Sequence, residues 1–165
     1  MNMTIQKQNI LDAIVAKLTQ ELDILIQSAK AAHEAATHEE SRAEDHHDTR
    51  GLEASYLAQA QGKRIEDLEQ QIAFFRNATF REFKPNDAVD VGALIELEIL
   101  PSRKRSFYFL LNHGGGLSVS VDGRTIQIIT PNAPLGEALL DKKVDDEIEV
   151  EGQGVTREYS VKNLG

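Results

Sequence analysis

Carboxylates are the residues in this sequence whose crowding points most directly to chemistry. Five of them fall close together in the first half of the chain, at Glu39, Glu40, Glu44, Asp45 and Asp48. Clustered carboxylate oxygens raise the local negative potential, and they are the ligands that a hard divalent cation such as Mg²⁺ prefers. The cluster therefore predicts either a solvated acidic turn or a site that works together with Mg²⁺.

Three histidines, His38, His46 and His47, flank these acids and raise the question of a transition-metal site. Neighbouring residues on a helix point about 100° apart, so an adjacent His-His pair is a poor chelate on its own. The chain has no cysteine, which excludes a disulfide framework and a Cys-ligated zinc site. We therefore expect no metal site that belongs to this chain alone.

The residues around the acidic cluster have the composition of helices. From residue 1 to about 77 there is no proline, and apolar residues recur at alternating spacings of three and four, typical of a coiled-coil seam. The first seam comprises Leu11, Ile14, Leu18, Leu22, Leu25, Ala29, Ala32 and Ala36, and the second comprises Ala54, Ala58, Gln61, Ile65, Leu68, Ile72 and Phe75. The stretch 37–50 between them lacks large apolar residues, which predicts an antiparallel helical hairpin over 1–77 with an acidic tip at 37–50.

The hairpin is expected to be long and narrow. Arms of about 30 residues each would span on the order of 45 Å at the helical rise of 1.5 Å per residue. Its seam changes from Ile and Leu near the base to Ala toward the tip, which would let the helices approach closely there. A thin rod of this kind is suited to reaching a distant site.

The second half reads as a small β-rich domain over 89–165, after a linker at 78–88 that contains Pro85. Short apolar runs predict strands over 91–100, 106–111, 117–121, 124–130, 148–151 and 158–164. Asp122-Gly123 predicts a two-residue hairpin turn, 134–140 a short helix capped by Asn132, and 103–105 a basic turn. The predicted fold class is α+β, a helical hairpin followed by a β-sheet domain with one short helix.

This second half has no nucleophile-base-acid arrangement, and its only histidine, His113, lies beside a run of glycines. We therefore expect a protein that is not itself an enzyme. A net charge of -9 argues against direct binding to a phosphate backbone, so contact with nucleic acid would be indirect, through another protein. There is no apolar run of about 20 residues and no signal-peptide pattern, from which we expect a cytoplasmic protein without membrane contact.

Two stretches together resemble the GreA/GreB family of bacterial transcription elongation (transcript cleavage) factors. In the second half, Thr130-Pro131, Leu139 to Lys142 and Asp145-Asp146 follow the pattern of that family's C-terminal domain, with Asp141 in place of its usual glycine. In the hairpin, Gly62 to Ile72 is similar to the family's Gly-Arg-Ile-x-x-Leu/Ile-Glu segment. The resemblance covers nearly the whole chain in the right order.

The resemblance implies an FKBP-like fold for the C-terminal domain and bacterial RNA polymerase as the partner. That domain would dock at the rim of the secondary channel, with Thr130, Pro131, Asn132, Ala133, Pro134 and Leu135 as the candidate polymerase-binding loop. The coiled coil would enter the channel, so that the factor reaches the RNA 3′ end only indirectly. The resemblance implies no cofactor of its own, only Mg²⁺ shared with the polymerase, and a monomer.

The tip departs from the family pattern Gly-Asp-Leu-x-Glu-Asn-Ala-Glu-Tyr. Counting back from Arg64 without a gap puts Glu44 and His47 on the family's two acids, whereas a shift of one residue gives Asp45 and Asp48 and restores the acid-x-x-acid spacing. We favour Asp45 and Asp48 as the working pair, with Glu44 as the alternative. His46, His47 and Arg50 are candidate modulators of the tip.

Three functional hypotheses remain from the sequence. The first is a Gre-like factor that stimulates RNA cleavage in backtracked complexes, and the second is a factor that occupies the channel and inhibits or modulates without cleavage. The third is a coiled-coil adaptor unrelated to polymerase. A prolyl isomerase is disfavoured, because its pocket needs an aromatic lining and this half has few aromatic residues and no tryptophan.

Overall fold

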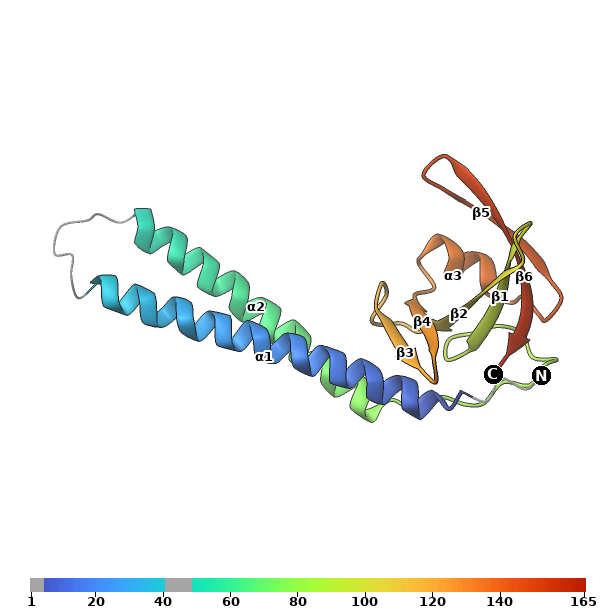
Figure 1. Ribbon diagram of the computed structural model, residues 1–165, viewed down its shortest axis with the longest axis horizontal. Coiled ribbons are helices and arrows are strands. Elements are labelled where there is room, and N and C mark those ends of the chain that lie inside the picture. Colours follow the sequence, from blue (N-terminus) through green and yellow to red (C-terminus); the bar gives the residue numbers. More distant parts are fainter. Residues whose placement is uncertain (1–4, 41–48) are drawn as a thin grey trace. The chain divides into compact units, whose positions relative to one another are not determined.

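The computed structural model describes residues 5–40 and 49–165, and the side chains of 5–35 and 58–165. Two long helices, α1 (Lys7–Glu40) and α2 (Thr49–Asn77), precede six strands and one short helix, α3 (Pro134–Leu139) (Figure 1). The predicted fold class is therefore confirmed. The chain forms two compact units, a helical unit of Val15–Arg76 and a sheet unit of Met1–Ile14 with Asn77–Gly165.

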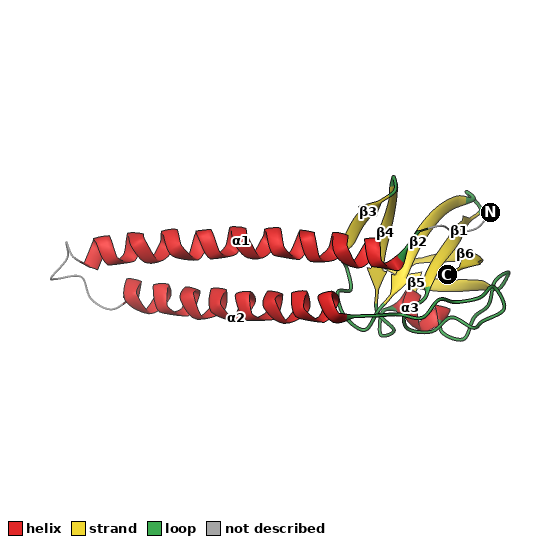
Figure 2. Ribbon diagram, turned by 90° about the horizontal axis from the view of Figure 1, so that it is seen from below, coloured by secondary structure: helices red, strands yellow, loops and turns green. Residues whose placement is uncertain are grey.

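In the helical unit, α1 and α2 lie side by side and run antiparallel (Figures 1 and 2). The predicted seam residues Leu18, Leu68 and Ile72 are buried, which confirms the spacing of the seam near its base. The burial fades along the hairpin, and the seam alanines Ala32 and Ala58 are exposed. The close packing expected through small residues is therefore absent at these two positions.

A cavity of about 310 Å³ lies between the two helices in the part of the hairpin where burial decreases. It is lined by Ile26, Ala29, Lys30, His33 and Glu34 of α1 and by Ile65 of α2. Nearer the base, Arg64 of α2 donates to Glu21 of α1 at 2.5 Å, but both side chains are largely exposed. An exposed ion pair of this kind contributes about 1 kcal/mol or less, so the buried base of the seam supplies most of the stability of the hairpin.

Gly62 of α2 allows a simple test of hairpin stability. An ideal Cβ on Gly62 would meet no other atom within 4 Å, and glycine inside a helix costs about 1 kcal/mol relative to alanine. Gly62→Ala is therefore expected to raise the free energy of unfolding of the helical unit by about 1 kcal/mol, measured by thermal melts followed by circular dichroism. A lower melting temperature would contradict the helical environment described for Gly62.

The sheet unit contains one six-stranded sheet in the order β3-β4-β2-β1-β6-β5. The strands are β1 (Leu94–Leu100), β2 (Lys104–Leu110), β3 (Ser118–Val121), β4 (Arg124–Ile129), β5 (Glu147–Gly152) and β6 (Val155–Leu164). Only β2 and β4 pair in parallel, and all other neighbours are antiparallel. Each strand overlaps a predicted one, so that the number and sequence positions of the strands are confirmed.

Three local features test the turn and cap predictions. Asp122 and Gly123 have φ of 51° and 73°, the left-handed pair that a two-residue hairpin turn needs, so this turn is confirmed. The basic turn was predicted too long, because Lys104 and Arg105 already belong to β2. The predicted Asn132 cap is wrong: Ala133 is the N-cap of α3, without a side-chain hydrogen bond.

One face of the sheet packs against α3 and the loops around it. Leu139 of α3 is fully buried in a cluster with Ile95, Leu97, Leu110 and Val161 from the central strands. On the other face, the rings of Phe80 and Phe109 meet edge to face at 5.5 Å between centroids. Both faces are covered around the centre of the sheet, which makes this unit a rigid support for the loop between β4 and α3.

Candidate functional site

The predicted tip acids Glu44, Asp45 and Asp48, and the histidines His46 and His47, lie outside the described residues, as does the side chain of Arg50. Their assignment stays a prediction. In the sequence, 44–48 fall between the end of α1 at Glu40 and the start of α2 at Thr49, and Arg50 belongs to the first turn of α2. Among the described side chains, those of 5–35 and 58–165, no group of three or more His, Cys, Asp or Glu residues could hold a metal ion.

The candidate docking loop Thr130 to Leu135 is described, and it joins β4 to α3 in the sheet unit. The Ala133 N–H donates to the Thr130 carbonyl at 3.0 Å, which closes the loop into a turn. Asn132 and Pro134 are exposed, whereas Thr130, Pro131 and Leu135 are half-buried. The loop thus presents a polar and a proline side chain to solvent from a backbone held by its neighbours.

Two glycines make room for Thr130. An ideal Cβ on Gly136 would lie 2.0 Å from the Thr130 carbonyl oxygen, and one on Gly115 would lie 2.9 Å from the Thr130 Cγ2. Real Cβ atoms essentially never approach a neighbour this closely. At Gly136 the neighbour is backbone, so this position requires glycine, whereas at Gly115 the Thr130 side chain would have to shift. Neither residue was predicted from the sequence, although the isolated Gly136 inside a short predicted helix is a signal of a packing constraint.

The perturbed pKa values lie away from this loop. Burial lowers the pKa of Lys7 to about 8, an effect that Glu82 partly offsets and Arg81 reinforces. The Lys84 backbone N–H and the Arg81 guanidinium lower the pKa of the Asp87 carboxyl, and burial raises the pKa of the Tyr108 hydroxyl. These groups contribute to the packing of the sheet unit, and none of them forms a nucleophile-base pair.

A search for helices that could cross a membrane finds none among the described residues. The longest, α1, carries charged residues along its length.

Comparison with protein families matches residues 84–164 to the family described as "Transcription elongation factor, GreA/GreB, C-term". This match covers the whole six-stranded sheet and the candidate docking loop. It also includes the Thr130-Pro131 and Asp145-Asp146 motifs that carried the resemblance in the sequence. No curated protein matches the chain.

Several solved structures are similar to the chain. GreA factor homolog 1 (Gfh1) of Thermus thermophilus has 20% identity and a TM-score of 0.38, covering 92% of this chain and 94% of that one. Thermus aquaticus Gfh1 has 19% identity and a TM-score of 0.38, covering 97% and 96%. A GreA/GreB factor of Nitrosomonas europaea has 20% identity and a TM-score of 0.38, covering 59% and 77%. Likenesses at this level carry no functional argument.

Proposed function

The chain belongs to the GreA/GreB family of transcription elongation factors through its residues 84–164, and from that membership we propose that it binds bacterial RNA polymerase. It would dock at the rim of the secondary channel and modulate elongation from there, as an auxiliary protein that acts through the active site of the polymerase. The single observation that carries this proposal is the family match over the sheet unit.

In this proposal the two units have separate tasks. The sheet unit docks through Thr130 to Leu135, because this loop is partly exposed and packs closely against Gly115 and Gly136. The helical hairpin supplies reach: α1 has 34 residues and α2 has 29, which correspond to lengths of about 50 Å and 44 Å. A rod of this length is suited to delivering a tip from a docking point to a distant catalytic centre.

The tip would act by charge. Asp45 and Asp48, with Glu44 as the alternative, supply the carboxylate oxygens that Mg²⁺ prefers. A Mg²⁺ ion shared with the polymerase would help to activate water for cleavage of the RNA 3′ end. From within the channel, the tip carboxylates would help to hold and position that ion, and would not perform chemistry of their own.

The proposal is tested by binding to core polymerase and by RNA cleavage in stalled, backtracked complexes. We expect Asp45→Asn/Asp48→Asn to reduce cleavage by about tenfold or more while binding stays within about twofold. The matched control is Asp23→Asn/Asp67→Asn, which removes the same charge from exposed positions on α1 and α2. This control is expected to leave both binding and cleavage unchanged.

The outcomes separate the hypotheses. Failure of the native protein to bind core polymerase overturns the proposal and favours an unrelated coiled-coil adaptor. Binding without any stimulation of cleavage overturns the cleavage role and identifies a factor that occupies the channel. Repeating the cleavage assay between about pH 6 and 7.5 tests His46 and His47, since the unperturbed imidazole pKa is roughly 6.5.

A further inference from the structure

Strand β5 lies at an edge of the sheet, with β6 as its only neighbour. In the part of the chain that the structure describes, no backbone hydrogen bond other than those of the β5–β6 ladder involves residues 147–152. An edge strand therefore presents a row of unpaired N–H and C=O groups along its outer side. Such an edge can accept an extended segment of another protein as an additional strand.

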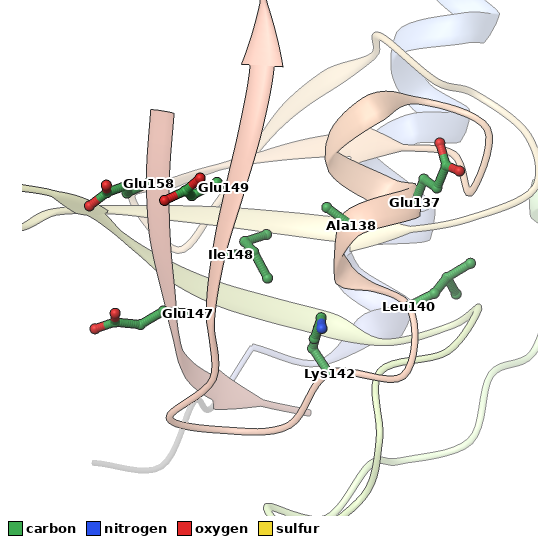
Figure 3. Close-up of a pocket in the computed structure, with 8 residues that line it drawn as sticks. All are labelled: Glu137, Ala138, Leu140, Lys142, Glu147, Ile148, Glu149 and Glu158. Atoms are coloured by element: carbon green, nitrogen blue, oxygen red, sulfur yellow. The ribbon is translucent and has the colours of Figure 1, made fainter. Parts of the chain in front are cut away.

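A groove of about 670 Å³ lies between α3 and this edge (Figure 3). Its apolar lining comes from Ala138 and Leu140 at the end of α3 and from Ile148 of β5. In Figure 3 the Ile148 side chain points toward α3. Ile148 is itself buried, with 6% of its surface exposed, so the apolar contact open to an added strand comes mainly from the half-buried Ala138 and Leu140.

The charge along the same edge is strongly negative. Glu147 and Glu149 are exposed on β5, and Glu149 stands directly opposite Glu158 of β6 in the ladder. Like charges directly opposite one another destabilise a sheet. Nevertheless, no described residue forms an ion pair with any of these three carboxylates, and Lys142 is the only cation among the residues that line the groove.

The alternation of side chains along β5 puts its acidic residues on one face of the strand and its apolar residues on the other. Successive side chains of a strand point to opposite faces, so Glu147 and Glu149 occupy one face and Ile148 the other. Figure 3 shows this arrangement, with the two glutamates directed away from α3. An occupant that matches both faces must alternate in the same way, with basic side chains on one face and apolar side chains on the other.

We propose that the outer edge of β5 and the adjoining groove bind an extended segment of a partner protein in which basic and apolar residues alternate. Its backbone pairs with β5. Its Lys or Arg side chains neutralise Glu147, Glu149 and Glu158, and its apolar side chains contact Ala138 and Leu140. This proposal is independent of the proposed function, because it uses a different surface from the loop Thr130 to Leu135.

A charged edge strand also deters pairing between copies of the same chain. That role alone requires repulsion and no partner, so it predicts no selective binding of any peptide. The two explanations therefore differ in whether the intact protein binds one peptide selectively, which can be measured.

The test uses three synthetic peptides and the full-length protein. One peptide alternates lysine and valine, one has the same composition in a block of lysines followed by a block of valines, and one alternates glutamate and valine. Binding is followed by the backbone amide resonances of 147–152 in NMR titrations. We expect the alternating lysine peptide alone to shift these resonances in a saturable manner, and its affinity to fall as salt rises.

The variant Glu149→Gln/Glu158→Gln is expected to weaken binding of the alternating lysine peptide by about tenfold. It is also expected to raise the midpoint of thermal unfolding, because it removes the opposed like charges. The matched control, Glu66→Gln/Glu69→Gln, makes the same change at exposed positions of α2 and should change neither the affinity nor the shifts at β5.

Three results would overturn the proposal. The first is the absence of saturable binding by the alternating lysine peptide. The second is equal binding by the block peptide, which would indicate attraction by charge alone. The third is that Glu149→Gln/Glu158→Gln leaves the affinity for the alternating lysine peptide unchanged and that the NMR shifts lie away from residues 147–152.

Discussion

Gly136→Ala is expected to lower the free energy of unfolding of the sheet unit by about 3 kcal/mol. The new Cβ would lie 2.0 Å from the Thr130 carbonyl oxygen and 2.8 Å from the Thr130 carbonyl carbon. Both atoms belong to the backbone, so the clash cannot be relieved by a side-chain rotation and the loop must move. Overpacking that forces backbone shifts typically costs about 1–3 kcal/mol, and we expect the upper end here because the contact is only 2.0 Å. The helix propensity that alanine gains over glycine, about 1 kcal/mol, offsets only part of this cost.

Urea denaturation measures this loss, and Gly152→Ala is its control. Gly152 lies at the end of β5 in the same unit, and an ideal Cβ there meets no atom within 4 Å. The control is expected to change the free energy of unfolding by about 1 kcal/mol or less. Equal stability of Gly136→Ala and the native protein would mean that the backbone at Thr130 is not held as the structure shows.

The same variant tests the docking loop. Under conditions in which Gly136→Ala is still folded, we expect its affinity for core polymerase to fall, because Thr130 to Leu135 must shift to accommodate the new methyl group. The Gly152→Ala control should bind like the native protein. Undiminished binding by a folded Gly136→Ala would remove this loop from the docking surface while leaving the other parts of the proposed function in place.

Much of the fold could be predicted from the sequence, because periodicity determines the type of each element. The seam spacing of three and four gave both long helices, and Leu18, Leu68 and Ile72 are buried as expected. Element ends were less predictable, because they depend on contacts that are distant in the sequence. The strand predicted from Val91 begins only at Leu94, since Gly92 has φ of 95° and packs against Phe80.

The wrong cap of α3 has a local cause. Asn132 is a favoured N-cap residue by type, but a cap must stand immediately before the first helical residue, which here is Pro134. The hydrogen bond from the Ala133 N–H to the Thr130 carbonyl places Asn132 in a turn instead. The N-cap preference of asparagine therefore had no effect here, because Pro134 fixes the start of the helix and Asn132 lies in the turn before it.

The surfaces were harder to predict than the elements. The need for glycine at 136 and the tight space at 115 arise from contacts with Thr130, and a sequence pattern does not show which residue a glycine approaches. The opposition of Glu149 and Glu158 follows from the register of the β5–β6 hairpin. That register, like the position of β5 at the edge of the sheet, depends on strand pairing that was not predicted from the sequence.

The buried amine of Lys7 gives the second large effect, a dependence of stability on pH. Lys7 Nζ donates to the Arg81 carbonyl at 2.6 Å and lies 4.9 Å from the centroid of the Phe83 ring. Loss of hydration outweighs these contacts and lowers the pKa of Lys7 from 10.5 to about 8. The folded protein therefore pays a penalty for the charged amine at neutral pH.

The direction in which stability changes with pH follows from proton linkage. Between pH 8 and 10.5 the unfolded chain keeps the proton of Lys7 while the folded protein has lost it, so this residue makes stability rise with pH. Below about pH 8 both states are protonated, and the penalty is fully present. We expect the free energy of unfolding of the native protein, relative to Lys7→Met, to increase from about pH 7 to 9.5, by at most about 1.4 kcal/mol per pH unit.

The comparison with Lys7→Met isolates this residue, because all other titrating groups are common to both proteins. The variant also loses the hydrogen bond to Arg81, which changes the difference between the two proteins by an amount that does not depend on pH. Lys63→Met is the control, since Lys63 is exposed on α2 and its removal should give a flat difference. A flat difference for Lys7→Met as well would mean that the ammonium remains hydrated in the folded protein, in conflict with its burial beside Phe83.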